Sequence, residues 1–278
     1  MNIIEFTGVV WVVSLLAGFL GSLTGLGGGI VITPLLTLAL GVDIRYAIGA
    51  TLISVIATSS GAAAAYVREG YSNIRIGMFL EIATTMGAVT GAVLTSRISA
   101  PAISLIFGFV LLYSAYAAGR PRHEHTGILP PDPLGTRLRM NGTYPTPEGM
   151  ASYNVHHVPA GFSLSFGAGI LSGLLGIGSG AVKVIAMDLA MGIPFKVATT
   201  TSNFMIGVTA AASAGIYLSR GYIDPGLAMP VMLGVVVGSL IGARVLTQAK
   251  THWLRIVFSL VIGIMAIEMI YHGLIGKV

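Results

Sequence analysis

The stretch GLGGG, Gly25–Gly29, interrupts an apolar sequence that reads FTGVVWVVSLLAGFLGSLT before it and IVITPLLTLAL after it. A glycine inside a helix costs roughly 1 kcal/mol relative to alanine, so four glycines in five residues predict a break in the helix. The break falls where the neighbouring residues are strongly apolar. In a bilayer, backbone that leaves the helix is tolerated only where protein or a watery cavity covers it.

The composition indicates that this break lies in a membrane. Apolar residues make up 54% of the 278 residues and charged residues only 9%, whereas soluble domains carry about 25% charged residues. Several apolar stretches approach the ~20 residues that a helix needs to span a bilayer. We therefore expect an all-α polytopic membrane protein whose basic residues report topology rather than nucleic-acid binding. The chain contains no cysteine, which excludes disulfide and thiolate chemistry.

A second glycine-rich break follows 151 residues after the first. A shift of 151 aligns residues 18–92 with 169–243 without a gap, and 20 of these 75 positions are identical. GLGGG then aligns with GIGSG, Gly176–Gly180. The expected domains are an N-terminal membrane repeat over 1–118, a polar linker over 119–158 and a C-terminal membrane repeat over 159–278.

Each repeat contains five apolar segments. The second segment of each, 30–41 and 181–193, would be about 18–20 Å long as a helix, too short for a hydrocarbon core of about 30 Å. It therefore predicts a V-shaped, re-entrant turn, an odd number of crossings per repeat and a second repeat that is inverted. The predicted segments are 6–23, 30–41, 46–67, 76–95, 102–118, 160–175, 181–193, 197–218, 226–246 and 256–275.

The basic residues favour this topology. With the N-terminus outside, ten Lys and Arg residues lie on the inner side and four on the outer side, against eight and six for parallel repeats. Because cytoplasmic loops carry the excess of positive charge, we expect the linker 119–158 to be cytoplasmic and the protein to be a multi-pass protein of the inner (plasma) membrane. The first apolar run lacks the positive start of a signal peptide.

The paired breaks predict an anion-binding site at the membrane midplane, because Gly-interrupted short segments in matching positions mark the binding sites of inverted-repeat transporters. Short helices that begin after each break would direct their N–H groups and positive dipole ends at the turn. Glycines leave that backbone open to a ligand. The candidate residues in the breaks are Gly25, Gly27, Gly28, Gly29, Gly176, Gly178, Ser179 and Gly180.

Polar side chains beside the breaks extend this candidate site. Lys183 stands where the first repeat has Ile32, and it could contact the anion, extend to the interface or pair with Asp188. Thr51, Ser202 and Asn203 could donate hydrogen bonds to an oxyanion or join helices to one another.

Three acidic residues lie within apolar segments and are candidates for a coupling proton: Glu81, Asp188 and Glu268. Ion pairing with Lys183, Arg97 or Arg244 is the alternative for each. Four histidines flank or lie in the linker, at 123, 125, 156 and 157, but their spacing is not that of a metal site. We expect no metal and no cofactor.

The two breaks with their surroundings resemble the sulfite exporter TauE/SafE family. The similar stretches are GFLGSLTGLGGGIVITPLLTLALGV followed by A-x-G-A-T, and GILSGLLGIGSGAVKVIAMDLAMGIP with ATTTSN. The second copy departs from the first in Ser179 and in Ile185, which replaces the proline. The resemblance implies a bacterial or archaeal inner-membrane permease for small sulfur-containing anions, such as sulfite or an organosulfonate.

Three functional hypotheses follow. The first is a secondary transporter, an exporter, that binds a small inorganic or organic sulfur oxyanion by alternating access; a homodimer is considered as well. The second is an anion channel on the same scaffold. The third is a membrane-embedded metalloenzyme that uses the linker histidines, and it ranks last because the sequence contains no nucleophile–base constellation. We expect no enzyme activity.

Overall fold

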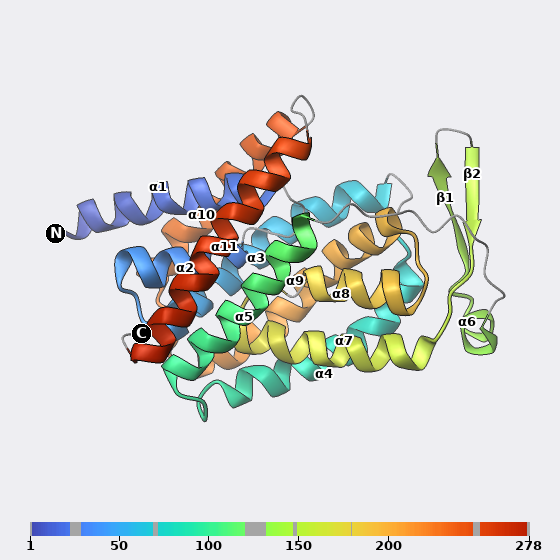
Figure 1. Cartoon of the computed structure of the whole chain (residues 1–278), viewed down its shortest axis with the longest axis horizontal. Helices are drawn as coiled ribbons and strands as arrows, with labels where there is room; N and C mark the ends of the chain where they lie inside the picture. The colour runs from blue at the N-terminus through green and yellow to red at the C-terminus, as the bar shows by residue number, and fades with distance from the viewer. Residues whose placement is uncertain are drawn as a thin grey trace.

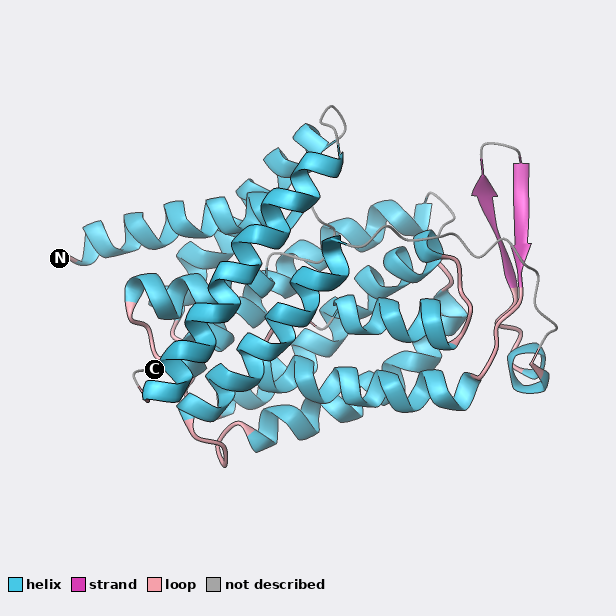
Figure 2. Ribbon diagram, in the orientation of Figure 1, coloured by secondary structure: helices cyan, strands magenta, loops and turns pink. Residues whose placement is uncertain are grey.

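The computed structural model describes residues 2–22, 29–68, 72–119, 132–146, 149–178, 180–246 and 251–276. These residues are mainly helical (Figure 2), and every predicted apolar segment corresponds to a helix. The first repeat contains α1 (Ile3–Ser22), α2 (Gly29–Pro34), α3 (Ile44–Arg68), α4 (Ile74–Leu94) and α5 (Ala100–Gly119). The second contains α7 (Val158–Leu175), α8 (Gly180–Ile185), α9 (Phe195–Ser219), α10 (Pro225–Leu246) and α11 (Thr251–Ile275).

The shift of 151 residues relates the elements as well as the sequence. It converts the bounds of α2 into those of α8 and the bounds of α3 into those of α9 without any difference. Each of the two short helices continues as a π-helical segment at matching positions, η1 (Leu35–Ala39) and η2 (Ala186–Ala190). The two repeats therefore have the same local structure, including its irregular parts.

The repeats pack against each other through two matching interfaces, α1 with α10 and α4 with α7, while α3 lies against its own counterpart α9. A Cβ atom added to Gly169 of α7 would overlap the backbone of Thr84 in α4. A Cβ atom added to Gly18 of α1 would overlap the backbone of Val235 in α10. Both members of the second pair are the 151-residue counterparts of the first. The interface is thus built twice from equivalent glycines.

The equivalent helices α1 and α7 run in opposite directions across the molecule (Figure 1). Helix α1 begins at the left of that view and runs to the right, whereas α7 begins at the right, beside the linker, and runs to the left. Both chain ends lie at the left.

The described part of the linker is folded. It contains the short helix α6 (Pro133–Arg137) and an antiparallel hairpin of β1 (Gly142–Thr146) and β2 (Gly149–Tyr153). The prediction of an all-α chain omitted this hairpin, because its short strands lack the alternating apolar pattern that marks a half-buried sheet. Apolar linker residues are buried against helices of the membrane repeats; the cluster includes Met140, Tyr153, Val155, Ile76, Leu80, Met187 and Met191.

Apolar side chains also cover the outside of the helices. Met78, Ile82, Met86, Val89 and Val93 form a stripe along α4 with exposed fractions between 37% and 62%. Within the described residues, α4 and α7 are long and apolar enough to cross a membrane, and further helices contain apolar stretches of 10–17 residues. Soluble monomers rarely expose long contiguous apolar stripes, so this surface fits a lipid environment.

Candidate functional site

The second break is a short non-helical segment between α7 and α8. Gly176 and Gly178 both have φ of +69°, a left-handed conformation that costs other residues roughly 1–2 kcal/mol. Space is restricted too, because a Cβ atom on Gly178 would lie 2.7 Å from Cγ2 of Ile206. Both backbone and packing therefore require glycine here. Ser179, and Gly25, Gly27 and Gly28 of the first break, lie outside the described residues.

Gly29, the described residue of the first break, lies beside Gly176 of the second. A Cβ atom built on Gly29 would be 3.5 Å from the carbonyl oxygen of Gly176 and 3.1 Å from Cγ2 of Thr51. A Cβ atom built on Gly180 would be 3.6 Å from the Ser202 hydroxyl. The structure thus brings together six of the predicted site residues from both repeats: Gly29, Thr51, Gly176, Gly178, Gly180 and Ser202.

The hydroxyls beside the breaks are engaged within the protein. Thr51 is fully buried, donates to the carbonyl of Ala47 and lies 2.8 Å from the Thr33 hydroxyl. Ser202 donates to the carbonyl of Gly180 at 3.2 Å. An anion in this place would have to draw these hydroxyls away from their present acceptors. Asn203 is half-buried, and as the next residue in α9 it points to a different face from Ser202.

Lys183 lies one helical turn beyond the second break, in a buried cluster of polar side chains. Its ammonium is fully buried and donates to Thr209 Oγ1 at 2.6 Å, and Thr209 in turn donates to Glu81 Oε1 at 2.7 Å. The distance from Lys183 Nζ to Glu81 Oε2 is 3.9 Å. Thr84 and Thr85 each donate to the Glu81 carboxylate at 3.0 Å. The structure shows an ion pair between Lys183 and Glu81, which was the expected alternative for Glu81 and was not among those for Lys183.

This charged cluster joins α4 of the first repeat to α8 and α9 of the second, and it occurs on one side of the molecule alone. The counterparts of Glu81 and Lys183 after the 151-residue shift are Met232 and Ile32, neither of which can carry charge. The sequence reasoning named Glu81 and Lys183 but missed Thr209. The counterpart of Thr209 is also a threonine, Thr58. This identity between the repeats could have marked Thr209 as a candidate site residue.

The other two acidic candidates lie elsewhere. Asp188 is half-buried in η2, and Glu268 is exposed on α11. The hydrogen bonds and the ion pair described above for the cluster join Glu81, Thr209 and Lys183 to one another. Within the described residues, no group of three or more His, Asp or Glu side chains is placed to hold a metal ion; two of the linker histidines, at 123 and 125, lie outside those residues.

Comparison with known proteins identifies the family. The family model for the sulfite exporter TauE/SafE matches residues 10–269, which include both breaks, the charged cluster and the linker. The chain belongs to the TauE/SafE family. As a TauE/SafE protein it is a membrane transporter.

Relatives of this TauE/SafE chain carry transporter names. It is 28% identical to "Probable membrane transporter protein YunE" of Bacillus subtilis, with 96% of this chain and 98% of the relative covered. It is 26% identical to YdhB of the same organism, with 85% and 87% covered. A probable membrane transporter protein of Methanocaldococcus jannaschii is 24% identical, with 93% of both chains covered. No solved structure matches the chain.

Proposed function

We propose that this TauE/SafE chain is a secondary transporter that exports a small sulfur-containing anion, such as sulfite or an organosulfonate, across the plasma membrane. The observation that carries the proposal is the proximity of Gly29 to Gly176, with the buried residue Thr51 beside Gly29 and the buried residue Ser202 beside Gly180. If an anion draws these two hydroxyls away from their present acceptors, they would donate to it as neutral groups, without the desolvation cost of several buried cations.

Alternating access of two inverted repeats is the proposed mechanism. It is supported by the opposite directions of α1 and α7 (Figure 1) and by the matching α1–α10 and α4–α7 interfaces. One repeat would rock against the other around the breaks. We place the linker in the cytoplasm, because this orientation puts ten Lys and Arg residues on the inner side of the membrane and four on the outer side.

Glu81 is the acidic residue whose surroundings fit a coupling role. Its carboxylate contacts Lys183 and Thr209 of the other repeat, so a proton on Glu81 would weaken its hold on the Lys183 ammonium. Lys183 would then be available to an anion near the second break. An anion that leaves a negative interior also gains about 2.3 kcal/mol per charge per 100 mV, and this gain favours export.

Replacement of the two hydroxyls tests the site. Thr51→Val and Ser202→Ala are each expected to lower sulfite efflux from proteoliposomes at least ~10-fold, because a hydrogen bond to a charged group contributes about 1.5–3 kcal/mol. Thr90→Val is the matched control, since the Thr90 hydroxyl is exposed and bonds within its own helix to Met86. Wild-type efflux in both site variants, with normal folding, would refute the site.

The channel alternative predicts a different flux. A transporter exchanges labelled sulfite against unlabelled sulfite on the other side, whereas a channel shows net flux without counterflow and a far higher turnover. The same proteoliposomes therefore distinguish the two functions.

A further inference from the structure

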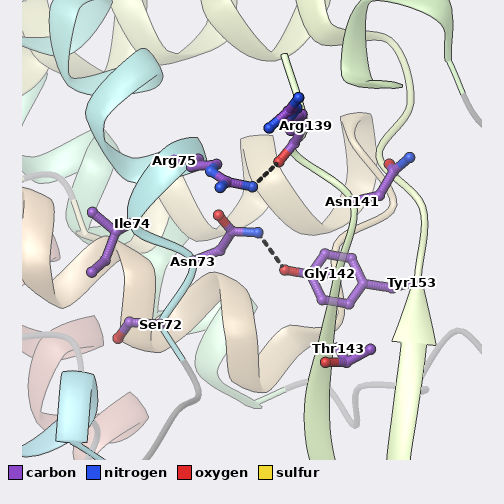
Figure 3. A pocket seen from close by; sticks show the side chains of 9 residues that line it. All are labelled: Ser72, Asn73, Ile74, Arg75, Arg139, Asn141, Gly142, Thr143 and Tyr153. Atoms are coloured by element: carbon purple, nitrogen blue, oxygen red, sulfur yellow. Dashed lines mark hydrogen bonds between the residues drawn. The ribbon is translucent and has the colours of Figure 1, made fainter. Parts of the chain in front are cut away.

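A pocket of about 230 Å³ lies between the start of α4 and the folded linker. Figure 3 shows its lining residues, which come from two parts of the chain that are far apart in the sequence. Ser72, Asn73, Ile74 and Arg75 belong to the start of α4, and Arg139, Asn141, Gly142, Thr143 and Tyr153 to the linker. None of them is a residue of the glycine breaks or of the Glu81–Thr209–Lys183 cluster.

Hydrogen bonds hold the two sides of this pocket in place. The Asn73 amide donates to the Tyr153 hydroxyl at 2.7 Å and to the Met140 carbonyl at 2.9 Å, as Figure 3 shows for the first bond. Arg75 Nη1 donates to the carbonyl of Arg139 at 3.2 Å. Because Tyr153 and Met140 are themselves buried, the linker is fixed on α4 and the pocket is preformed.

The lining offers positive charge and donors without a matching acidic group. Arg75 and Arg139 both line the pocket, and none of the nine described residues that line it is acidic. The Ser72 hydroxyl is buried and has no hydrogen-bond partner among the described residues. Tyr153 accepts a bond from Asn73, which leaves its own proton free to donate, and burial raises the pKa of Tyr153, so that proton stays in place.

Arg139 is held in an unusual backbone conformation at this pocket. Its φ is +51°, in the left-handed region that costs a residue with a side chain roughly 1–2 kcal/mol. The bond from Arg75 to the Arg139 carbonyl stabilises that conformation. Glycine would adopt it more easily.

We propose that this pocket is a second anion site, which binds a small oxyanion of the phosphate or sulfate type through Arg75 and Arg139. Guanidinium groups present paired donors that match the oxygens of such anions. The pocket volume leaves room for one such anion with bound water. The free oxyanion of the aqueous phase and the phosphate of an anionic lipid headgroup share this chemistry.

Inorganic phosphate is the probe that tests the site. In equilibrium dialysis of the purified full-length protein at low ionic strength, Arg75→Gln and Arg139→Gln are each expected to weaken phosphate binding at least ~10-fold. Arg137→Gln is the matched control, because Arg137 is an exposed arginine of the same linker that does not line the pocket. Arg139→Gly removes the guanidinium but relieves the backbone, so it is expected to lose phosphate with an equal or higher Tm.

A variant of the transport site serves as a second control for phosphate binding. Thr51→Val, a variant of the proposed transport site, should keep wild-type phosphate affinity, so the second site can fail or hold independently of the transport site. Equal phosphate affinity in the wild type, Arg75→Gln and Arg139→Gln would overturn the proposal, as would loss in Thr51→Val alone.

Nanodiscs distinguish the two sources of the anion. The ligand is a lipid headgroup if phosphatidylglycerol, but not phosphatidylcholine, displaces phosphate from the wild type. In that case phosphatidylglycerol should also raise the Tm of the wild type but not that of Arg139→Gln. If phosphate binds equally in both lipids and still depends on Arg139, the ligand is a free anion. Failure of both phosphate and phosphatidylglycerol to distinguish the wild type from Arg139→Gln would overturn the site.

Discussion

Lys183→Met is expected to destabilise the protein by about 3–5 kcal/mol, the usual cost of removing one partner of a buried ion pair. Glu81 is 8% exposed and would keep the three threonine hydroxyls that donate to it, but it would lose its cation. Because proteins are stable by only about 5–15 kcal/mol in total, we expect a large fall in the thermal midpoint in detergent. Methionine fills a similar volume, so the loss reports charge rather than packing.

The double variant Glu81→Gln with Lys183→Met separates charge from structure. Each single variant leaves one buried charge without its partner, whereas the double variant leaves none. We therefore expect the double variant to recover most of the lost stability, with an interaction energy of at least about 2 kcal/mol in the double-mutant cycle. Additive effects of the two substitutions would show that the 3.9 Å pair contributes nothing to folding.

The same double variant bears on function. It is expected to fold and to bind sulfite weakly, since Thr51 and Ser202 remain, yet a pH gradient should no longer change its sulfite flux. A flux that still responds to the pH gradient in proteoliposomes would rule out Glu81 as the coupling group and leave Asp188 and Glu268 to be tested.

The helices could be predicted from the sequence because their cause is local. Runs of apolar residues ended by glycine, proline and charge define each segment, and the 151-residue repeat located the same elements twice. The linker hairpin could not be predicted in this way. Its burial depends on the contacts of Met140 and Tyr153 with Asn73 at the start of α4, which join residues 67 and 80 positions apart in the sequence.

Only the part of the candidate site that both repeats share could be predicted with the same local reasoning. The glycine breaks carry a local signal, and their contact follows from the repeat. The ion pair of Lys183 with Glu81 carries no such signal, since the residues belong to different repeats and their counterparts, Ile32 and Met232, are uncharged. Symmetry reasoning therefore finds the shared part of the site. The pairing of Glu81 with Lys183 was expected only as one alternative, because both are ionisable residues within apolar segments.

Gly169→Leu and Gly18→Leu are expected to prevent stable folding, or to cost more than about 3 kcal/mol each. An added side chain normally costs about 1–3 kcal/mol in a packed core, because neighbouring side chains move aside. At these glycines the atoms in the way are backbone atoms, of Thr84 and of Val235, and backbone in a helix cannot change rotamer. Relief would require α4 to separate from α7, or α10 from α1.

The same helices supply the controls. Gly167 in α7 and Gly8 in α1 have no atom within 4 Å of an added Cβ, and leucine is a better helix former than glycine by roughly 0.5–1 kcal/mol. Gly167→Leu and Gly8→Leu should therefore fold like the wild type in size-exclusion chromatography and thermal melts. If Gly18→Leu folded and Gly169→Leu did not, close helix contact would be needed at the α4–α7 interface but not at the α1–α10 interface. That outcome would contradict the expectation of two equivalent interfaces. Two repeats that rock as equivalent bodies require close contact at both, because each glycine contact fixes one repeat against the other at the corresponding place.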